Sequence, residues 1–304
     1  MPGPLRNIRR RYLPPVMLAQ GLLNLALRAP GVVASYGADV TWLERNFAPG
    51  LDDFAFMLKS PLVVDIDDAI WLYNPFGQSM IKRLVGRADM VFAGNRFLAD
   101  WCAQYCREVR VVPTAIDTDR FYPRARSEEK NEFVVGWTGT SGNFRFLESI
   151  ESALADFLTM NRDAVFMIVA DERPNLTRLP AEQVKYKPWT PATEHTALTE
   201  MDVGIMPIDD SDLSRGKCSF KMLQYMAAGL PVIVSPYGMN QEILGLNAVG
   251  FGARSDSEWL SALETLKQDR PLRTRLGGSG RSVVESSFST ASIAAKIAEA
   301  FGEL

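Results

Sequence analysis

From residue 32 onward, short apolar runs alternate with longer stretches in which apolar residues recur every three or four positions. The short runs are typical of buried strands and the periodic stretches of helices. Their alternation predicts βα units built on a parallel sheet. The predicted strands span residues 39–43, 62–66, 90–93, 109–112, 133–137, 165–169, 184–186, 203–206 and 231–234. The predicted helices span residues 51–59, 77–87, 95–106, 144–160, 216–228, 256–268, 271–286 and 290–302.

The periodic pattern stops between Asp117 and Lys130, where charged residues and proline replace it. We therefore place a domain boundary between residues 126 and 127. The predicted domains are residues 1–126, which form a short first domain, and residues 127–304, with closing C-terminal helices. The predicted fold class is α/β, with two doubly wound, Rossmann-like domains that face a cleft.

The charge balance narrows the range of partners. Lys and Arg together number 33 and Asp and Glu number 36, which gives a net charge of −3. Binding to nucleic acid depends on a basic surface that neutralises phosphates. We therefore do not expect nucleic acid as a partner.

The N-terminal end departs from this balance. Residues 1–38 include Arg6, Arg9, Arg10, Arg11 and Arg28 and no acidic residue. The apolar run between Arg11 and Arg28 is shorter than the roughly 20 residues that a membrane-spanning helix needs. It predicts a first helix that is buried or partly amphipathic. The alternative is an interfacial helix through which residues 1–28 contact the inner face of a membrane, and both interpretations place the protein in the cytoplasm.

Cysteine and histidine are too few for most metal chemistry. Cys102 and Cys106 lie one helical turn apart, Cys218 is distant, and His195 is the single histidine. Three cysteines cannot all pair, so a reducing compartment is the simplest interpretation. We expect no metal site, and we assign no role to His195.

The first candidate for chemistry is a loop of small residues after the predicted strand 133–137. Its members are Gly139, Thr140, Ser141 and Gly142, and a predicted helix follows them. Small residues let backbone N–H groups approach a phosphate, which a helix N-terminus also attracts. The alternative is an ordinary tight turn, because the loop is neither a Walker A motif nor a full dinucleotide fingerprint.

The second candidate is a set of cations around the start of the predicted helix 216–228. Arg215 would lie at the helix start, and Lys217, Lys221 and Gln224 recur at spacings of four and three, which places them on one helix face. Three cations beside a helix N-terminus form a site for a diphosphate. The alternative is a basic face that only contacts water.

The third candidate is a group of acids at the end of the apolar strand 62–66. Asp65, Asp67 and Asp68 would repel one another there unless they bound a cation, joined a hydrogen-bond network or acted as general acid and base. Haloacid-dehalogenase phosphatases place two aspartates two positions apart at such an end and bind Mg²⁺. A structural alternative is that these carboxylates cap the following helix.

Several motifs together resemble the GT4-type retaining glycosyltransferases, which have the two-domain GT-B fold. The densest resemblance runs from Asp202 to Ile243 and includes the segment Lys221 to Ser235, KMLQYMAAGLPVIVS. Weaker matches occur in the first half, at 95–98 and 112–117. The resemblance implies an acceptor-side first domain and a second domain that binds a nucleotide-diphosphate sugar.

The resemblance also implies roles for single residues. Gln224 takes the position of a ribose-binding glutamate, while Gly216 stands where a sugar-contacting glutamate is usual. Trp189 is expected beside the base. The sugar would meet Met239 and Asn240, with Asp67 and Asp68 as the candidate catalytic residues.

The implied activity is transfer of a hexosyl group with retention, to a glycan or lipid-linked acceptor, as in polysaccharide biosynthesis. The donor would be a nucleotide sugar, and we expect neither a cofactor nor a metal. Family members usually begin with a strand and a glycine-rich loop that are not found before residue 39, so the first domain is short by two or three strands. The alternative is therefore a non-catalytic relative that binds nucleotide sugars or serves as a partner protein.

Overall fold

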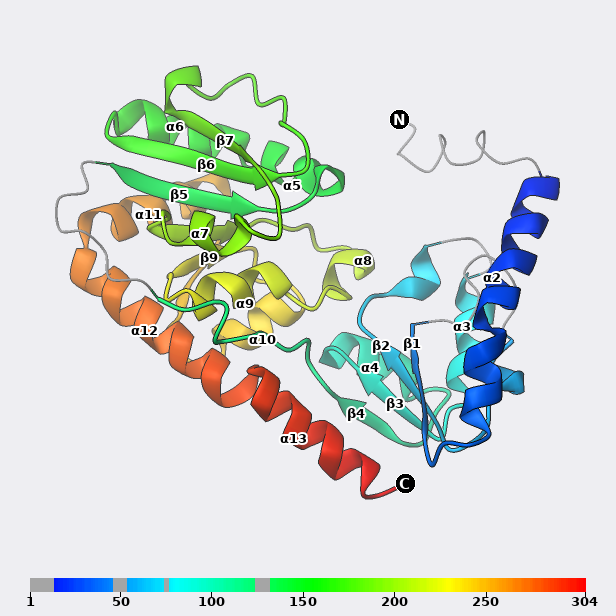
Figure 1. Cartoon of the computed structure of the whole chain (residues 1–304). Coiled ribbons are helices and arrows are strands. Elements are labelled where there is room, and N and C mark those ends of the chain that lie inside the picture. The colour runs from blue at the N-terminus through cyan, green and yellow to red at the C-terminus, as the bar shows by residue number, and fades with distance from the viewer. Residues whose placement is uncertain (1–13, 46–53, 74–76, 124–131) are drawn as a thin grey trace. The chain divides into compact units, whose positions relative to one another are not determined.

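The computed structural model describes residues 14–45, 54–73, 77–123 and 132–304 (Figure 1). The chain divides into two compact units. Met1–Val112 and Ala298–Leu304 form the first unit, and Pro113–Ile297 form the second. The predicted boundary between residues 126 and 127 lies outside the described residues.

A parallel sheet of four strands forms the centre of the first unit, in the order β1-β2-β3-β4. Strand β2 is buried along Leu62, Val63 and Val64, as its unbroken apolar run predicts for the interior of a parallel sheet. The strands are β1 (Thr41–Glu44), β2 (Leu62–Ile66), β3 (Met90–Ala93) and β4 (Val109–Val111). The helices before Val112 are α2 (Pro14–Ser35), α3 (Gly77–Val85) and α4 (Arg96–Cys102), with 3-10 turns η1 (Ala55–Met57) and η2 (Ile70–Leu72).

The last residues of the chain complete the first unit. The ring of Phe301 contacts Trp42 and Phe92 at centroid distances of 5.7 Å, and Glu303 pairs with Arg110. Aromatic edge contacts of this kind add to the stability that burial of the rings provides. Sequence patterning did not assign residues 298–304 to the first domain.

Helix α2 is more exposed than the sequence predicts. Among its described side chains, Leu23, Leu27 and Val33 are exposed and Ser35 is buried. Within the described part of the chain, every helix is too short or too polar to cross a membrane. Residues 1–13, which carry four of the arginines of the proposed membrane contact, lie outside the described residues.

The second unit contains a parallel sheet of six strands in the order β7-β6-β5-β8-β9-β10. Numbered along this unit, the order is 3-2-1-4-5-6, which is that of a Rossmann fold. The chain reverses its direction of growth across the sheet between β5 and β8, which pair through Val135 and Gly136. The strands are β5 (Phe133–Thr138), β6 (Ala164–Ala170), β7 (Val184–Pro188), β8 (Val203–Met206), β9 (Val232–Val234) and β10 (Gly250–Gly252).

Helices cover both faces of this sheet. On one face Phe157 of α6 and Trp259 and Leu263 of α11 pack against apolar strand residues such as Phe166. On the other face Tyr225 of α9 lies so close to Gly204 that a Cβ at that position would be 2.2 Å from the tyrosine ring. The helical segments are η3 (Ser141–Asn143), α5 (Phe144–Glu148), α6 (Glu151–Met160), η4 (Ala181–Gln183), α7 (Glu194–Leu198), α8 (Asp212–Arg215), α9 (Phe220–Ala227), α10 (Met239–Leu244), α11 (Asp256–Gln268), α12 (Arg270–Ser287) and α13 (Thr290–Phe301).

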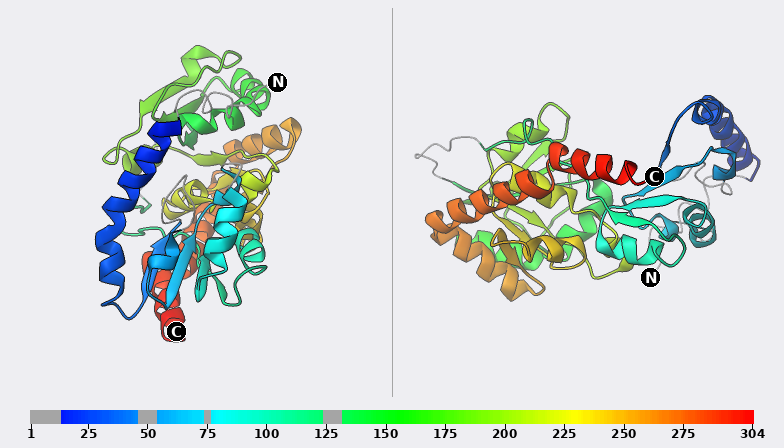
Figure 2. Two further views of the ribbon diagram at one scale, coloured as in Figure 1. Left: turned by 90° about the vertical axis from the view of Figure 1, so that its right-hand side faces the viewer. Right: turned by 90° about the horizontal axis from the view of Figure 1, so that it is seen from below.

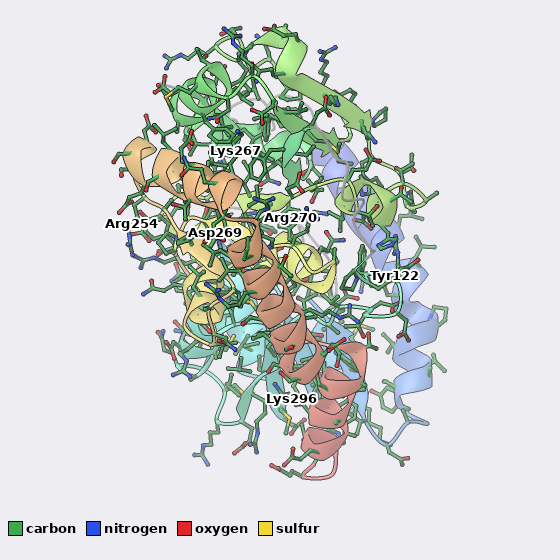
Figure 3. The ribbon with its side chains drawn as sticks, turned by 90° about the vertical axis from the view of Figure 1, so that its left-hand side faces the viewer. Tyr122, Arg254, Lys267, Asp269, Arg270 and Lys296 are labelled. Carbon is green, nitrogen blue, oxygen red and sulfur yellow. The ribbon has the colours of Figure 1, made fainter. Side chains whose placement is uncertain are left out.

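Local capping explains where these helices begin and end. Helices α11 and α12 meet at a turn at Asp269, whose carboxylate accepts a hydrogen bond from Leu272 N–H (Figures 2 and 3). Gly229 follows α9 with a φ of 70°, the left-handed conformation that the sequence predicts for this helix end. Arg281 of α12 donates hydrogen bonds to the carbonyls of Thr118 and Phe121. These bonds hold residues 118–121 against α12 within the second unit.

The predicted fold class is confirmed, with two parallel-sheet α/β domains of which the first is small. All nine predicted strands are present, and the bounds of β2, β3 and β8 agree with the prediction. Strand β10 was not predicted, because Gly-Phe-Gly has no apolar run. Of the predicted helix 51–59, residues 51–53 lie outside the described residues, and residues 55–57 form a single 3-10 turn.

Candidate functional site

The point where the second sheet reverses its order is the natural place for a ligand, because open α/β sheets bind ligands beyond the carboxyl ends of their strands at such points. The loops after β5 and β8 both lie there. Arg145 after β5 and Asp209 after β8 connect these loops through an ion pair of 3.5 Å. The hydroxyl of Tyr225 accepts a hydrogen bond of 2.7 Å from Thr138 N–H, which fixes α9 to the end of β5.

The loop after β5 is partly occupied by its own hydrogen bonds. The N–H groups of Gly139 and Asn143 donate to Val169 O and Thr140 O, and Ser141 donates through N–H and Oγ to Asp171 at 2.6 and 2.9 Å. Of residues 139–143, Thr140 and Gly142 therefore offer the backbone N–H groups best suited to a phosphate. The predicted role of Gly139 and Ser141 in binding a diphosphate is not favoured by this geometry.

The predicted helix 216–228 is divided in the structure. Helix α8 ends at Arg215, and α9 begins only at Phe220, because Ser219 has a left-handed φ of 51° that interrupts helical continuity. Arg215 therefore lies at a helix end, where its guanidinium pairs with Asp210 at 2.8 Å. Lys217 lies on the link between the two helices. The prediction that Lys217 shares one helix face with Lys221 and Gln224 is wrong.

A buried carboxylate brings together three of the predicted residues. Glu194 Oε1, at the start of α7, accepts hydrogen bonds from Gln224 Nε2 at 2.9 Å, Trp189 Nε1 at 3.2 Å and Lys221 Nζ at 3.4 Å. Its Oε2 accepts one from Arg120 Nη2 at 3.0 Å. We call these five residues the Glu194 cluster.

The strand order explains why the Glu194 cluster forms at the carboxyl ends of the strands. Trp189 follows β7 directly and donates through N–H to Ala170 O, the last residue of β6. The helix start with Glu194 follows within a few residues. Lys221 and Gln224 occupy the first half of α9, and Lys221 Nζ donates to Gln224 Oε1 at 2.9 Å. The cluster thus lies beyond the carboxyl ends of the strands of this sheet.

The electrostatics of the Glu194 cluster favour an ionised carboxylate. Burial alone would raise the pKa of Glu194, but the hydrogen bonds from Gln224 and Trp189 and the charge of Lys221 outweigh it and hold the pKa below its usual range. Burial lowers the pKa of Lys221, and Glu194 opposes this effect. Burial also raises the pKa of Tyr225 to about 12, so its hydroxyl stays protonated.

The predicted sugar-binding residues are buried. Met239 and Asn240 begin α10, and Asn240 Nδ2 donates to Ser235 O at 3.0 Å. Among the residues that the structure describes, none forms a hydrogen bond with Asn240 Oδ1. Gly238, just before them, packs against the backbone of Arg215, where a Cβ would come within 2.8 Å. These contacts are consistent with a role in shaping the loop, and sugar binding by Met239 and Asn240 stays a prediction.

The predicted catalytic acids form a separate cluster in the first unit. Arg45 donates two hydrogen bonds to Asp67, at 2.8 and 2.7 Å, and lies 3.6 Å from Asp68. Burial and the charge of Asp67 raise the pKa of Asp65 to about 6, although Asp65 is hydrogen-bonded to Trp42. We call Arg45, Asp65, Asp67 and Asp68 the Asp65 cluster. No group of three or more His, Cys, Asp or Glu residues in the described part of the chain is arranged to hold a metal ion.

One family model matches a stretch of the second unit. Residues 133–269 match the family model described as "Glycosyl transferases group 1". The matched stretch makes up somewhat under half of the chain and contains Trp189, Glu194, Lys221 and Gln224. A comparison with curated proteins gives no match.

Solved glycosyltransferase structures share the fold. Sucrose-phosphate synthase from Thermosynechococcus elongatus is 14% identical, with a TM-score of 0.73 over 96% of this chain and 80% of that one. HepE from Anabaena, solved with UDP and glucose, is 16% identical, with a TM-score of 0.71 over 92% and 82% of the two chains. A glycosyltransferase from Rickettsia africae is 14% identical, with a TM-score of 0.68 over 97% and 83%. The predicted resemblance to GT-B glycosyltransferases is confirmed, and the GT4 assignment stays a prediction.

Two residues of the Glu194 cluster were missed at the level of sequence. The sequence pattern assigns no role to Glu194, and Arg120 falls in the predicted linker. An acidic residue at the first position of a helix is a recognisable signal, which would have drawn attention to Glu194. No sequence signal pairs Arg120 with Glu194, because they are 74 residues apart and belong to no common motif.

Proposed function

We propose that the protein is a glycosyltransferase that moves a hexosyl group from a nucleotide-diphosphate sugar to a glycan or lipid-linked acceptor, with retention of configuration. The observation that carries this proposal is the Glu194 cluster beyond the carboxyl ends of the strands of the second sheet, because four of its five residues lie within the stretch that matches the group 1 glycosyltransferase model. There the indole of Trp189, the ammonium group of Lys221 and the amide of Gln224 lie together, which suits a base, a diphosphate and a ribose.

The chemistry to be assisted is departure of a nucleoside diphosphate. The bond from the anomeric carbon to the diphosphate breaks while a bond to the acceptor oxygen forms, negative charge grows on the leaving group, and the departing diphosphate takes up the proton of the acceptor hydroxyl. Fixed positive charges and N–H groups at that point lower the barrier. Lys221 and the N–H groups of Thr140 and Gly142 are our candidates for this role, with Arg215 and Lys217 as further predicted contacts.

Residues for the other parts of the substrates are proposed as follows. Trp189 would stack on the base, Gln224 would contact the ribose, and Met239 and Asn240 would line the sugar. Asp67 and Asp68 would orient the sugar or the acceptor hydroxyl. We propose that no metal or cofactor takes part and that residues 1–28 contact the inner face of a membrane, which would suit a lipid-linked acceptor in the cytoplasm.

HepE has been solved with UDP-glucose as well as with UDP, so UDP-sugars are the first donors to test. The experiment measures release of UDP or GDP from a panel of nucleotide sugars with a polysaccharide or lipid-linked acceptor. We expect turnover with one or a few donors. NMR of the product would show whether the anomeric configuration is retained.

The matched variants are Lys221→Ala and Lys267→Ala. Lys267 pairs with Asp163 at 3.0 Å, and Asp163 directly precedes β6, at the amino edge of the sheet. Lys221→Ala should abolish most turnover, and Lys267→Ala should leave it unchanged. Binding of a nucleotide sugar without turnover by any donor would instead indicate a non-catalytic binding or partner protein. An absence of nucleotide binding would contradict both functions.

A further inference from the structure

The carboxylate of Glu194 accepts four hydrogen bonds from the side chains around it. Three donors reach its Oε1 and one reaches its Oε2, from Gln224, Trp189, Lys221 and Arg120. Two carboxylate oxygens offer about four acceptor sites in total. The four donors therefore equal the total acceptor capacity of the carboxylate, and Oε1 is the more heavily used oxygen.

Exposure divides the Glu194 cluster into an inner pair and an outer set. The side chain of Glu194 is 8% exposed and Gln224 is fully buried. By contrast, Trp189 is 40% exposed, and the side chains of Arg120 and Lys221 are 44% and 27% exposed. Glu194 is thus shielded, while the groups that it holds face outward.

The outer set has the chemistry of a nucleotide subsite. An indole offers a flat surface for a base, and two adjacent cations match the charge of a diphosphate. Without a shared anion, the charges of Arg120 and Lys221 would repel each other. Because both bind the same carboxylate, they can stay close together before a ligand arrives.

We propose that Glu194 is the positioning residue of the nucleotide subsite, holding Trp189, Lys221 and Arg120 in the arrangement that receives a nucleoside diphosphate. Arg120 thereby becomes a second cation of this subsite. The inference rests on the proposed function, since it assigns the roles of residues within the same donor site. Glu194 itself does not touch the ligand, because its oxygens are occupied and shielded.

The first test is Glu194→Gln, which keeps the size of the side chain and removes its charge. A glutamine has one acceptor oxygen, so it cannot receive all four donors. We expect the Kd for UDP or GDP, measured by calorimetry, to rise about tenfold or more, since two charge-assisted hydrogen bonds are lost. In turnover assays the KM for the donor should rise more than kcat falls.

Asp202→Asn is the matched control. Asp202 is also a buried carboxylate of the second unit, and its Oδ2 accepts a hydrogen bond of 2.8 Å from Val134 N–H at the amino end of β5. This variant should lower the melting temperature without changing the Kd. If both variants weaken binding equally, the role of Glu194 is merely structural and the inference fails.

An exchange of the inner pair sharpens the test. Gln224→Glu alone places two carboxylates side by side and should weaken binding. The double variant Glu194→Gln with Gln224→Glu restores one carboxylate and one amide, and it should recover at least part of the lost affinity. Additive losses in the double variant would show that the two residues do not act as a unit, which would contradict the inference.

Arg120→Gln covers the case in which Glu194→Gln does not fold. Arg120 is half exposed, so its loss should leave the fold intact, and we expect a Kd about three- to tenfold higher. An unchanged Kd would overturn the inference, while the proposed function would stand. If the wild-type protein binds neither UDP nor GDP, the proposed function itself falls.

Discussion

The Glu194 and Asp65 clusters are both built around carboxylates near the carboxyl ends of parallel strands, yet the charges around them differ. Glu194 stands alone among two cations and two neutral donors. In the Asp65 cluster, Arg45 pairs with Asp67 and Asp68, and its charge also acts on Asp65. The pKa of Glu194 is accordingly lowered, whereas burial and the charge of Asp67 raise the pKa of Asp65 to about 6.

The comparison teaches that position in the fold does not fix what a carboxylate can do. Glu194 stays ionised over the physiological range and suits a fixed electrostatic role. Asp65 changes its charge near neutral pH and suits proton exchange or the binding of a hydroxyl group. Each of the following changes alters one side of this contrast, and the largest effect comes first.

Lys221→Met should have the largest effect on stability. It removes a cation from a buried carboxylate, and among the described residues Arg120 is then the charged partner that Glu194 keeps. We expect the free energy of unfolding to fall by about 3 kcal/mol, at the lower end of the range for a broken buried pair. Urea denaturation at pH 7 measures it. Lys267→Met breaks the pair with Asp163 and should cost under about 1 kcal/mol; equal losses would show that Glu194 does not depend on Lys221.

The same variant should lose its effect in acid. Because the folded-state pKa of Glu194 is depressed, the stability from its ionised form is present above the usual glutamate pKa and is lost as the pH falls through the lowered value. The difference in unfolding free energy between wild type and Lys221→Met should therefore shrink at the acid end of a pH series. A difference that stays constant would point to packing of the lysine stem rather than to charge.

Asp65→Asn should stabilise the protein, with the opposite pH dependence. The pKa of Asp65 is raised from 3.8 to about 6, so the folded state binds more protons than the unfolded chain between these values, and wild-type stability falls as the pH rises through this window. An asparagine avoids this cost. We expect a gain of up to about 3 kcal/mol at pH 8 that disappears near pH 4.

The control for this prediction is Asp100→Asn, which changes an exposed carboxylate of the same unit. Its unfolding free energy should match the wild type at both pH values. If Asp65→Asn gives the same small change as Asp100→Asn at pH 8, the pKa of Asp65 is not raised by its surroundings, and the contrast between the two clusters would disappear.

How far the sequence predicts each cluster depends on the distance between its members along the chain. The three aspartates lie at the end of one strand, with Asp65 inside it and Asp67 and Asp68 just after it, so the apolar run 62–66 locates them together. The Glu194 cluster joins residue 120 to residues near 190 and near 220, and only the strand order of the folded sheet brings these together. Lys221 and Gln224 were found because the spacing of three on one helix is a local property.

The predictions that the structure contradicts also have local physical causes. The spacing of Lys217, Lys221 and Gln224 predicts one helix face with Arg215 at the helix start, but the left-handed Ser219 separates α8 from α9. Serine in that conformation leaves no mark in a hydrophobic pattern. The parallel sheets were predicted well because their buried strands are apolar along nearly every position, which is the strongest pattern in the chain.

Arg45→Met should have the smallest effect on stability, even though Arg45 makes a closer ion pair than Lys221 does. Its partners Asp67 and Asp68 have side chains 34% and 26% exposed, so water replaces the lost guanidinium, and we expect a cost of under about 1 kcal/mol. The charge of Arg45 also opposes the rise of the pKa of Asp65, so the titration of Asp65, followed by NMR, should move to higher pH in the variant. A cost as large as that of Lys221→Met would mean that the Asp65 cluster depends on its cation as fully as Glu194 does, and exposure would then not be what separates the two.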